Sequence, residues 1–336
     1  MRRLLTRLLG RSRAERATPR PLIVAVTIAA LAVLVTSGCS GSGNGEPPRS
    51  STESRTTGAV TDGSAAEVVV DEKDIDIGGR TLYLRCWGVE VPGEPTVLLL
   101  SGSGPTTSTW ELMAPDLASE GHHLCAYDRL GVGRSDPVLD ARRTTTDQVD
   151  DLVALLDAAD LQEPVVLTAH SLGSLPAVGL VDRAPERVAG VVLVDPWSPR
   201  VAAAQRAALP PEKAEEIPDL AEDRRIVTDY VFDPAQNPEH LLLAEEDEDA
   251  VRLFAAPGPL FGDLPVVVLT RPPPPYLSGL PRRYYRAYTS ALEDGAREFA
   301  AESTRGTLVT VEDSGHNIHE DRPEVVTEAI LDVLAG

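Results

Sequence analysis

The chain has 336 residues, of which 42% are hydrophobic, so it is long enough to bury one large α/β core. Its formal charge is −21, because 52 acidic side chains outnumber 31 basic ones. So acidic a protein is repelled by nucleic acid, which excludes that class of partner. The three cysteines and six histidines show no Cys-x-x-Cys or His-Glu-x-x-His spacing, so neither a metal site nor a cofactor is predicted.

The N-terminal segment has the features of an export signal. Residues 1–20 carry seven arginines and one acidic residue, and an uncharged apolar run follows from Leu22 to Val35. That run of fourteen residues is short for a membrane-spanning helix, although a permanent single span is the alternative. Thr36-Ser37-Gly38-Cys39 resembles the box of small residues before the acylated cysteine of bacterial lipoproteins. We expect a lipoprotein-type signal peptide over residues 1–38 and lipidation of Cys39, with ordinary cleavage and secretion as the alternative.

Residues 39–66 are rich in Gly, Ser, Thr and Pro and show no apolar periodicity. Such a segment cannot bury enough surface to fold, so we expect a flexible tether. Removing residues 1–38 leaves 24 basic against 51 acidic side chains, or −27. Because that charge opposes contact with anionic membrane lipids, we expect the lipid attached to Cys39 to hold the protein on the extracytoplasmic side of the cell membrane.

Short apolar runs alternate with helical segments from residue 67 to the C-terminus. This alternation predicts a mostly parallel sheet with helices on both faces. The helix expected over Thr146–Ala159 is amphipathic, as a helix that covers a sheet should be. Eight strands are predicted, at Asp74–Ile77, Leu82–Trp87, Thr96–Leu100, His122–Tyr127, Val165–Ala169, Ala189–Val194, Pro265–Thr270 and Thr307–Val311.

The predicted strand at Val165–Ala169 runs into a small-x-Ser-x-small turn, Ala169-His170-Ser171-Leu172-Gly173, and then a helical pattern. A strand-turn-helix of this kind presents a nucleophilic serine at its apex, and crowding by the neighbouring backbone requires small flanking residues. If the helix begins at Leu172, its first N–H groups point to where an oxyanion would form. Pro176 predicts a disturbance early in that helix. Ser171 is therefore the candidate nucleophile.

This turn resembles the nucleophile elbow of the α/β-hydrolase superfamily, and the resemblance covers residues 67–336. It implies an α/β-hydrolase fold with an eight-stranded sheet. The family usually opens the elbow with Gly, where this chain has Ala169, and writes His-Gly after its third strand, where this chain has Ser101-Gly102. The resemblance further implies that the backbone N–H groups of Ser103 and Leu172 form the oxyanion hole.

A second motif, Tyr127–Asp136, is similar to the Tyr-Asp-x-x-Gly-x-Gly-x-Ser turn common in esterases of this superfamily. Its two glycines lack the third glycine and the following helix that would receive a pyrophosphate, so no dinucleotide site is predicted. We interpret Asp128 and Arg129 in this turn as structural residues.

Cys86 and Cys125 fall in two predicted strands that are neighbours in the sheet order implied by the resemblance. An oxidising compartment permits a bridge between them. We expect a disulfide, and two buried free thiols are the alternative.

From Trp197 to Asp263 the strand pattern stops and the segment becomes helical and acidic. In the superfamily an insertion after the sixth strand caps the active site. We therefore expect residues 197–263 to form a short cap over a modest pocket. A solvated acidic loop without that role is the alternative.

A nucleophilic serine needs a base within hydrogen-bond reach. His316 follows the last predicted strand in a Ser-Gly-His setting, where the family carries its histidine. His319 lies three residues further on, and His170 directly precedes the serine. We expect His316 to be the base, His319 to point elsewhere, and His170 to be packed and hydrogen-bonded.

The base needs an acid that orients it. Many family members carry this acid after the seventh strand, but no carboxylate follows that strand closely here. Asp195 closes the predicted sixth strand, the family's alternative position, and Pro196 keeps it out of helical dihedral angles. We expect Asp195 to be the acid, with Asp263 or Asp294 as alternatives.

The sequence thus predicts a serine hydrolase that cleaves small-molecule carboxylic esters through an acyl-enzyme, with Ser171, His316 and Asp195 as its triad. The same triad can serve a lipase, thioesterase, peptidase or C–C bond hydrolase. A dehalogenase or epoxide hydrolase is disfavoured, because those enzymes carry Asp where this chain has Ser171. The alternative from another class is a catalytically silent lipoprotein that binds a ligand or a partner under its cap.

Overall fold

The computed structural model describes residues 68–139, 142–161, 164–228, 237–242, 247–255, 258–276 and 279–336. The expected signal peptide, the lipidation site Cys39 and the tether lie outside these residues. Among the helices that the structure describes, none has the length and apolar character needed to cross a membrane.

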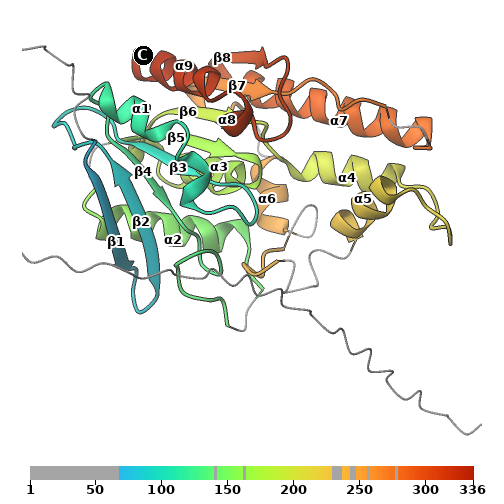
Figure 1. Ribbon diagram of the computed structural model, residues 1–336, viewed down its shortest axis with the longest axis horizontal. Coiled ribbons are helices and arrows are strands. Elements are labelled where there is room, and N and C mark those ends of the chain that lie inside the picture. The colour runs from blue at the N-terminus through green and yellow to red at the C-terminus, as the bar shows by residue number, and fades with distance from the viewer. Residues whose placement is uncertain are drawn as a thin grey trace, which may run out of the picture. The chain divides into compact units, whose positions relative to one another are not determined.

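Eight strands form a single sheet in the order β1-β2-β4-β3-β5-β6-β7-β8 (Figure 1). Strand β2 pairs antiparallel with β1 and β4, and the other neighbours pair in parallel. The strands are β1 (Val70–Asp76), β2 (Thr81–Trp87), β3 (Val97–Leu100), β4 (Leu124–Tyr127), β5 (Val165–His170), β6 (Val188–Val194), β7 (Gly262–Thr270) and β8 (Ser303–Thr310). The predicted eight-stranded, mostly parallel sheet is confirmed. The edge strands β1 and β8 begin four residues earlier than expected, because pairing with a neighbour, and not burial, extends them.

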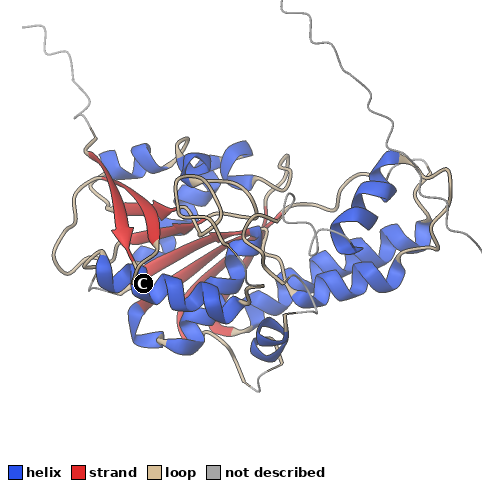
Figure 2. Ribbon diagram, turned by 90° about the horizontal axis from the view of Figure 1, so that it is seen from below, coloured by secondary structure: helices blue, strands red, loops and turns tan. Residues whose placement is uncertain are grey.

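Helices cover both faces of the sheet (Figure 2). One apolar core lies between the sheet and α2 (Thr145–Ala158), α3 (Ser174–Arg183) and α7 (Arg282–Ala301). The other lies between the sheet and α1 (Ala114–Ser119) and α9 (Pro323–Leu334). In β3, Leu98 and Leu100 enter the first core and Leu99 the second. Burial on both faces explains why the central strands read as continuous apolar runs.

The turn after β5 starts as a 3₁₀ turn, Ser171–Gly173, and the α-helix α3 follows from Ser174. Pro176 therefore falls in the first turn of α3, where its missing N–H removes no helical hydrogen bond. The disturbance predicted from Pro176 is wrong, because α3 continues as one α-helix to Arg183. A Cβ on Gly173 would lie 2.6 Å from the backbone oxygen of Leu100, so the crowding that demands a small residue is real.

The segment between β6 and β7 contains α4 (Pro199–Ala208), α5 (Pro218–Thr228) and α6 (Glu248–Leu253) in its described part. Helix α4 packs along α7 and contacts α5, and α6 lies against α2 and α3 (Figure 1). The described part of the segment between β6 and β7 is therefore helical, as expected.

The short helix α8 (Ile318–Asp321) joins β8 to α9.

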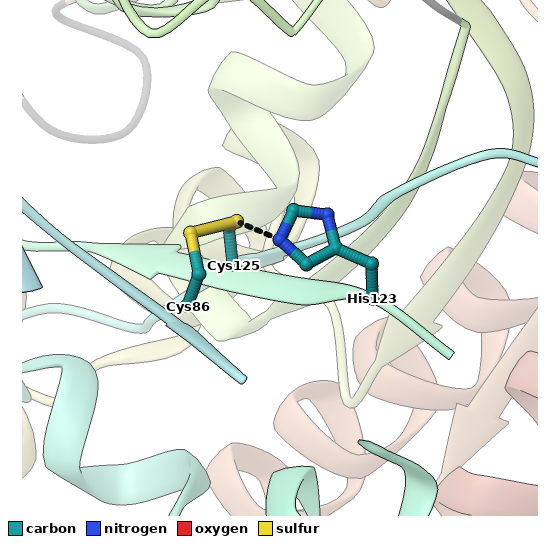
Figure 3. A group of neighbouring side chains, drawn as sticks. All are labelled: Cys86, His123 and Cys125. Carbon is teal, nitrogen blue, oxygen red and sulfur yellow. Dashed lines mark hydrogen bonds between the residues drawn. A yellow bond between two sulfur atoms is a disulfide. The ribbon is translucent and has the colours of Figure 1, made fainter. Parts of the chain in front are cut away.

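The predicted disulfide joins Cys86 of β2 to Cys125 of β4, which lie directly opposite each other in the antiparallel pair (Figure 3). His123 lies beside the bridge, with Nε2 3.6 Å from Cys125 Sγ and Nδ1 2.9 Å from Thr96 Oγ1. These three side chains are close enough to share a metal ion. Because the two sulfurs are bonded to each other, they cannot supply the thiolates that such an ion would take.

Reducing this bridge is expected to lower the free energy of unfolding by about 4 kcal/mol, because the two cysteines are 39 residues apart and the open loop gains chain entropy in the unfolded state. Urea unfolding with and without reductant measures the loss, and the double variant Cys86→Ala/Cys125→Ala serves as a control that reductant should not affect. Non-reducing peptide mapping should show the two peptides joined. Two freely alkylated thiols in unreduced protein would contradict the bridge.

Candidate active site

Ser171 lies at the apex of the turn between β5 and α3 with φ of +49°, in the left-handed region that non-glycine residues rarely adopt. Two hydrogen bonds to the Ser171 backbone hold the turn. The Ser171 backbone oxygen accepts hydrogen bonds from Ser174 Oγ at 2.7 Å and from Trp197 N–H at 3.2 Å. The strained turn thus projects the Ser171 side chain beyond the carboxyl edge of the sheet.

A histidine and a carboxylate continue from Ser171 in one hydrogen-bonded chain. His316, in the loop between β8 and α8, places Nε2 2.9 Å from Ser171 Oγ. Its Nδ1 lies 2.6 Å from Asp195 Oδ2. The structure therefore brings together the three residues predicted from the sequence, in the order that lets a histidine take a proton from a serine while a carboxylate orients the ring.

Asp195 directly follows β6 with φ of +43°, and its N–H donates to the backbone oxygen of Leu269 at 2.8 Å. Its carboxylate also accepts from the Arg271 side chain, Nε to Oδ2 at 2.9 Å, and from the Arg271 backbone at 3.3 Å. Arg271 carries no sequence signal that marks it as a site residue. Arg271 directly follows β7, the position where many family members carry their carboxylate. In this chain that position supplies a guanidinium, which holds the carboxylate of Asp195 after β6.

The two alternative acids are not near His316. Asp263 is exposed at the start of β7, whereas Asp195 follows the end of the parallel neighbour β6, so the two lie at opposite edges of the sheet. Asp294 is exposed on α7 and pairs with Arg297. Neither residue can orient the histidine that contacts Ser171.

The other two histidines near the serine are buried beside His316. Centroids of the His170 and His316 rings are 4.7 Å apart, and those of His170 and His319 are 4.4 Å apart. His319 points away from Ser171, as expected, with Nε2 2.7 Å from Thr109 Oγ1 and its ring against Trp110. His170 is packed, as expected, and its Nε2 lies 3.1 Å from the backbone oxygen of His316.

Burial keeps both of these histidines uncharged at neutral pH. It lowers the pKa of His319 to about 4 and holds the pKa of His170 well below its usual value, and neighbouring histidines lower it further. A neutral His170 must carry its proton on Nε2 to donate to the His316 carbonyl. His170 thus supports the backbone of His316 and, being neutral, does not compete with it for a proton.

The buried histidines make stability depend on pH. Because their folded pKa values lie below the unfolded value near 6.5, the unfolded state takes up protons first as the pH falls. The contribution of these histidines to the free energy of unfolding is therefore fully present above about pH 6.5 and is lost as the pH falls below it. For His319 alone the loss is on the order of 3 kcal/mol near pH 4. Urea unfolding between pH 7.5 and pH 4.5 measures the slope. His319→Gln should flatten it, and an unchanged slope in that variant would contradict the assignment.

A cavity of about 390 Å³ opens above Ser171. Its volume is in the lower part of the range of small-molecule sites, as expected for a short insertion. Helices α4 and α5 of the insertion form one wall, and the loop after β3 and the turn after β5 form the floor. The floor includes Ser103 and Leu172, the two predicted oxyanion-hole residues, together with Gly102, Ser171 and His316.

The sequence matches the alpha/beta hydrolase family over residues 97–329. The chain belongs to the α/β hydrolase family. Family membership and the sheet order together assign this chain the α/β hydrolase fold, and the cavity lies at the carboxyl edge of its sheet.

Relatives within the α/β hydrolase family differ in the reactions for which they are named. A haloalkane dehalogenase of Mesorhizobium japonicum is 29% identical over 266 residues, which covers 71% of this chain and 84% of that protein. RutD of Variovorax paradoxus, named provisionally as a carbamate hydrolase, is 40% identical over 102 residues. That match covers 30% of this chain, and the chain spans only 38% of the length of RutD.

Solved structures agree with the fold. Carboxylesterase CesB of Bacillus subtilis superposes with a TM-score of 0.51 at 18% identity, covering 81% of this chain and 94% of that one. A haloalkane dehalogenase variant of Bradyrhizobium elkanii gives a TM-score of 0.54 at 19% identity, covering 80% and 97%. At such low identities these likenesses establish the α/β hydrolase fold alone.

Proposed function

We propose that the protein hydrolyses carboxylic esters of small molecules through an acyl-enzyme. The observation that carries the proposal is the hydrogen-bonded chain from Ser171 Oγ through His316 to Asp195, at the floor of a cavity of about 390 Å³. A serine that donates to a histidine held by a carboxylate is the arrangement needed for nucleophilic acyl transfer.

In the first half of the proposed reaction Ser171 Oγ attacks the ester carbonyl while His316 Nε2 takes the hydroxyl proton. Asp195 accepts the Nδ1–H bond and stabilises the positive charge that develops on the ring. The carbonyl oxygen becomes an oxyanion, for which the N–H groups of Ser103 and Leu172 are the proposed donors. Collapse breaks the bond to the alcohol oxygen, which leaves as the alcohol with the proton from His316.

In the second half a water molecule attacks the acyl-Ser171 carbonyl, and His316 takes the water's proton. The second tetrahedral intermediate expels Ser171 Oγ, which recovers its proton from His316, and the carboxylic acid is released. One water is consumed, and the enzyme returns to its starting state. Arg271 takes part only by holding the Asp195 carboxylate in line with Nδ1.

Dehalogenation, the activity in the name of the Mesorhizobium relative, does not fit a serine at this position. Displacement of a halide by Ser171 Oγ would form an alkyl ether. An ether has no carbonyl carbon for water to attack, so the enzyme could not be regenerated. The residue at the apex of the turn therefore favours substrates with an acyl carbon.

Two assays test the proposal. A fluorophosphonate probe should label the wild-type protein and fail to label Ser171→Ala. A panel of p-nitrophenyl esters of increasing chain length, with a p-nitrophenyl carbamate, a thioester and a p-nitroanilide, should give turnover that is fastest for an ester. Labelling that survives Ser171→Ala would reject the nucleophile. Absence of both labelling and turnover would favour the silent, ligand-binding alternative.

The sequence of residues 1–66 supports a further part of the proposal, that a lipid on Cys39 holds the mature protein on the extracytoplasmic side of the cell membrane. Cys39→Ala should move the protein from the detergent phase to the aqueous phase in detergent partitioning, because the folded domain is too acidic to bind anionic lipid unaided. A wild-type protein already in the aqueous phase would indicate ordinary secretion.

A further inference from the structure

Arg129, the second residue after β4, contacts the loop that carries Gly102 and Ser103. Its Nη1 donates to the backbone oxygen of Ser101, and its Nη2 donates to the backbone oxygen of Gly102 at 2.7 Å. The other edge of the guanidinium donates to Glu239, with Nε to Oε2 at 2.6 Å and Nη2 to Oε1 at 2.8 Å. The side chains of Arg129 and Glu239 are 5% and 2% exposed. Because this buried ion pair is bidentate, it holds the Arg129 guanidinium in one orientation.

The bond to Gly102 determines the direction of the Ser103 N–H. The Gly102 carbonyl and the Ser103 N–H belong to the same peptide group, and no peptide bond in the described residues is cis. In a trans peptide these two groups point in opposite directions. Because the carbonyl points at Arg129, the Ser103 N–H points away from it, and Ser103 lines the cavity with Ser171 and Leu172. A cationic donor on the carbonyl also polarises the peptide and strengthens its N–H as a donor.

The counter-ion of Arg129 comes from the insertion. Residues 237–242 lie against the core, where Arg143 N–H donates to His240 O at 2.9 Å and Leu242 N–H donates to Arg143 O at 2.8 Å. The approach is close enough that a Cβ on Gly131 would lie 2.2 Å from Pro238 O. Glu239 Oε2 is also 3.4 Å from Gln148 Nε2. Glu239 is thus held in place and balances a cation that would otherwise face two carbonyls in a buried site.

We propose that Arg129, with Glu239 as its counter-ion, is a positioning residue that sets the Gly102–Ser103 peptide as an oxyanion-hole donor. The inference rests on the proposed function, because an oxyanion forms only if Ser171 attacks a carbonyl. It gives the turn after β4 and residues 237–242 of the insertion a role in positioning the oxyanion hole, although their side chains act only through the Gly102–Ser103 peptide.

The test compares Arg129→Lys and Glu239→Gln with wild type on one p-nitrophenyl ester and on a trifluoromethyl ketone, which forms a tetrahedral adduct with an active serine. A lysine cannot reach both carbonyls and both carboxylate oxygens, so kcat should fall about 10- to 100-fold with KM within about threefold. Affinity for the ketone should fall in parallel with kcat/KM. Glu239→Gln should show the same pattern at roughly tenfold.

Arg143→Lys is the matched control, because Arg143 forms a buried ion pair with Asp151 and contacts the same insertion segment without touching Ser101 or Gly102. It should lower the midpoint of thermal unfolding, while kcat and ketone affinity stay within about twofold of wild type.

A folded Arg129→Lys variant with wild-type kcat and ketone affinity would overturn the inference. A loss that appears equally in Arg143→Lys would also overturn it, since both would then be purely structural. If Arg129→Lys fails to fold, Glu239→Gln decides on the same criteria. A wild-type protein that neither turns over the ester nor binds the ketone would reject the proposed function, and the inference with it.

Discussion

Replacement of Ser171 by Ala is expected to lower kcat for ester hydrolysis by on the order of 10⁴- to 10⁶-fold, because the variant has no oxygen to form the acyl-enzyme. His316→Ala should lose about as much, since Ser171 Oγ then has no base within reach. The double variant should be no worse than either single variant, because the two residues act as one unit. Steady-state kinetics on one p-nitrophenyl ester, with circular dichroism to confirm each fold, measures all three.

Ser290→Ala is the matched control, because Ser290 is exposed on α7 and its hydroxyl contacts only Asp294 among the described residues. Its turnover should equal that of wild type. A double variant that loses the product of the two single effects would mean that Ser171 and His316 contribute independently, and the acyl-transfer mechanism would then be wrong.

Asp195→Asn is expected to lower turnover by about 10⁴-fold with little change in fold. The amide keeps the shape of the carboxylate but removes its charge, and its NH₂ group favours the wrong tautomer of His316. It also leaves the Arg271 guanidinium, now 2.9 Å from Asp195 Oδ2, without its counter-ion. The expected loss is therefore in kcat, together with a modest loss of stability.

Asp263→Asn and Asp294→Asn provide controls at the two other candidate positions. Both side chains are exposed and lie away from His316, so turnover should stay within a few-fold of wild type. If Asp195→Asn kept wild-type turnover while one of the controls lost it, the acid would have been misassigned. The Ser171 and His316 assignments would not depend on that result.

Local sequence signals were sufficient for the strands and the turn at Ser171. Each is encoded within a few residues: the run Val165–Ala169 is apolar because it is buried on both faces, and Gly173 is small because a Cβ would meet the backbone of Leu100. The disulfide needed the sheet order implied by the family resemblance, because its two cysteines are 39 residues apart. The first turn of the helix after Ser171 was less predictable, because 3₁₀ and α turns share the same short-range pattern.

By itself the sequence determined the fold class. It predicted Ser171 as the nucleophile, His316 as the base and Asp195 as the acid, from residue types at strand ends and from the resemblance of the surrounding motifs to the superfamily. Only the tertiary structure decided which charged side chains, far apart in the sequence, form ion pairs with each other. Arg271 reaches Asp195 across two strand ends, and Arg129 reaches Glu239 over a separation of 110 residues. The physical reason is that a buried cation is stable only beside a specific carboxylate or carbonyl, and no local pattern records which one the fold brings to it.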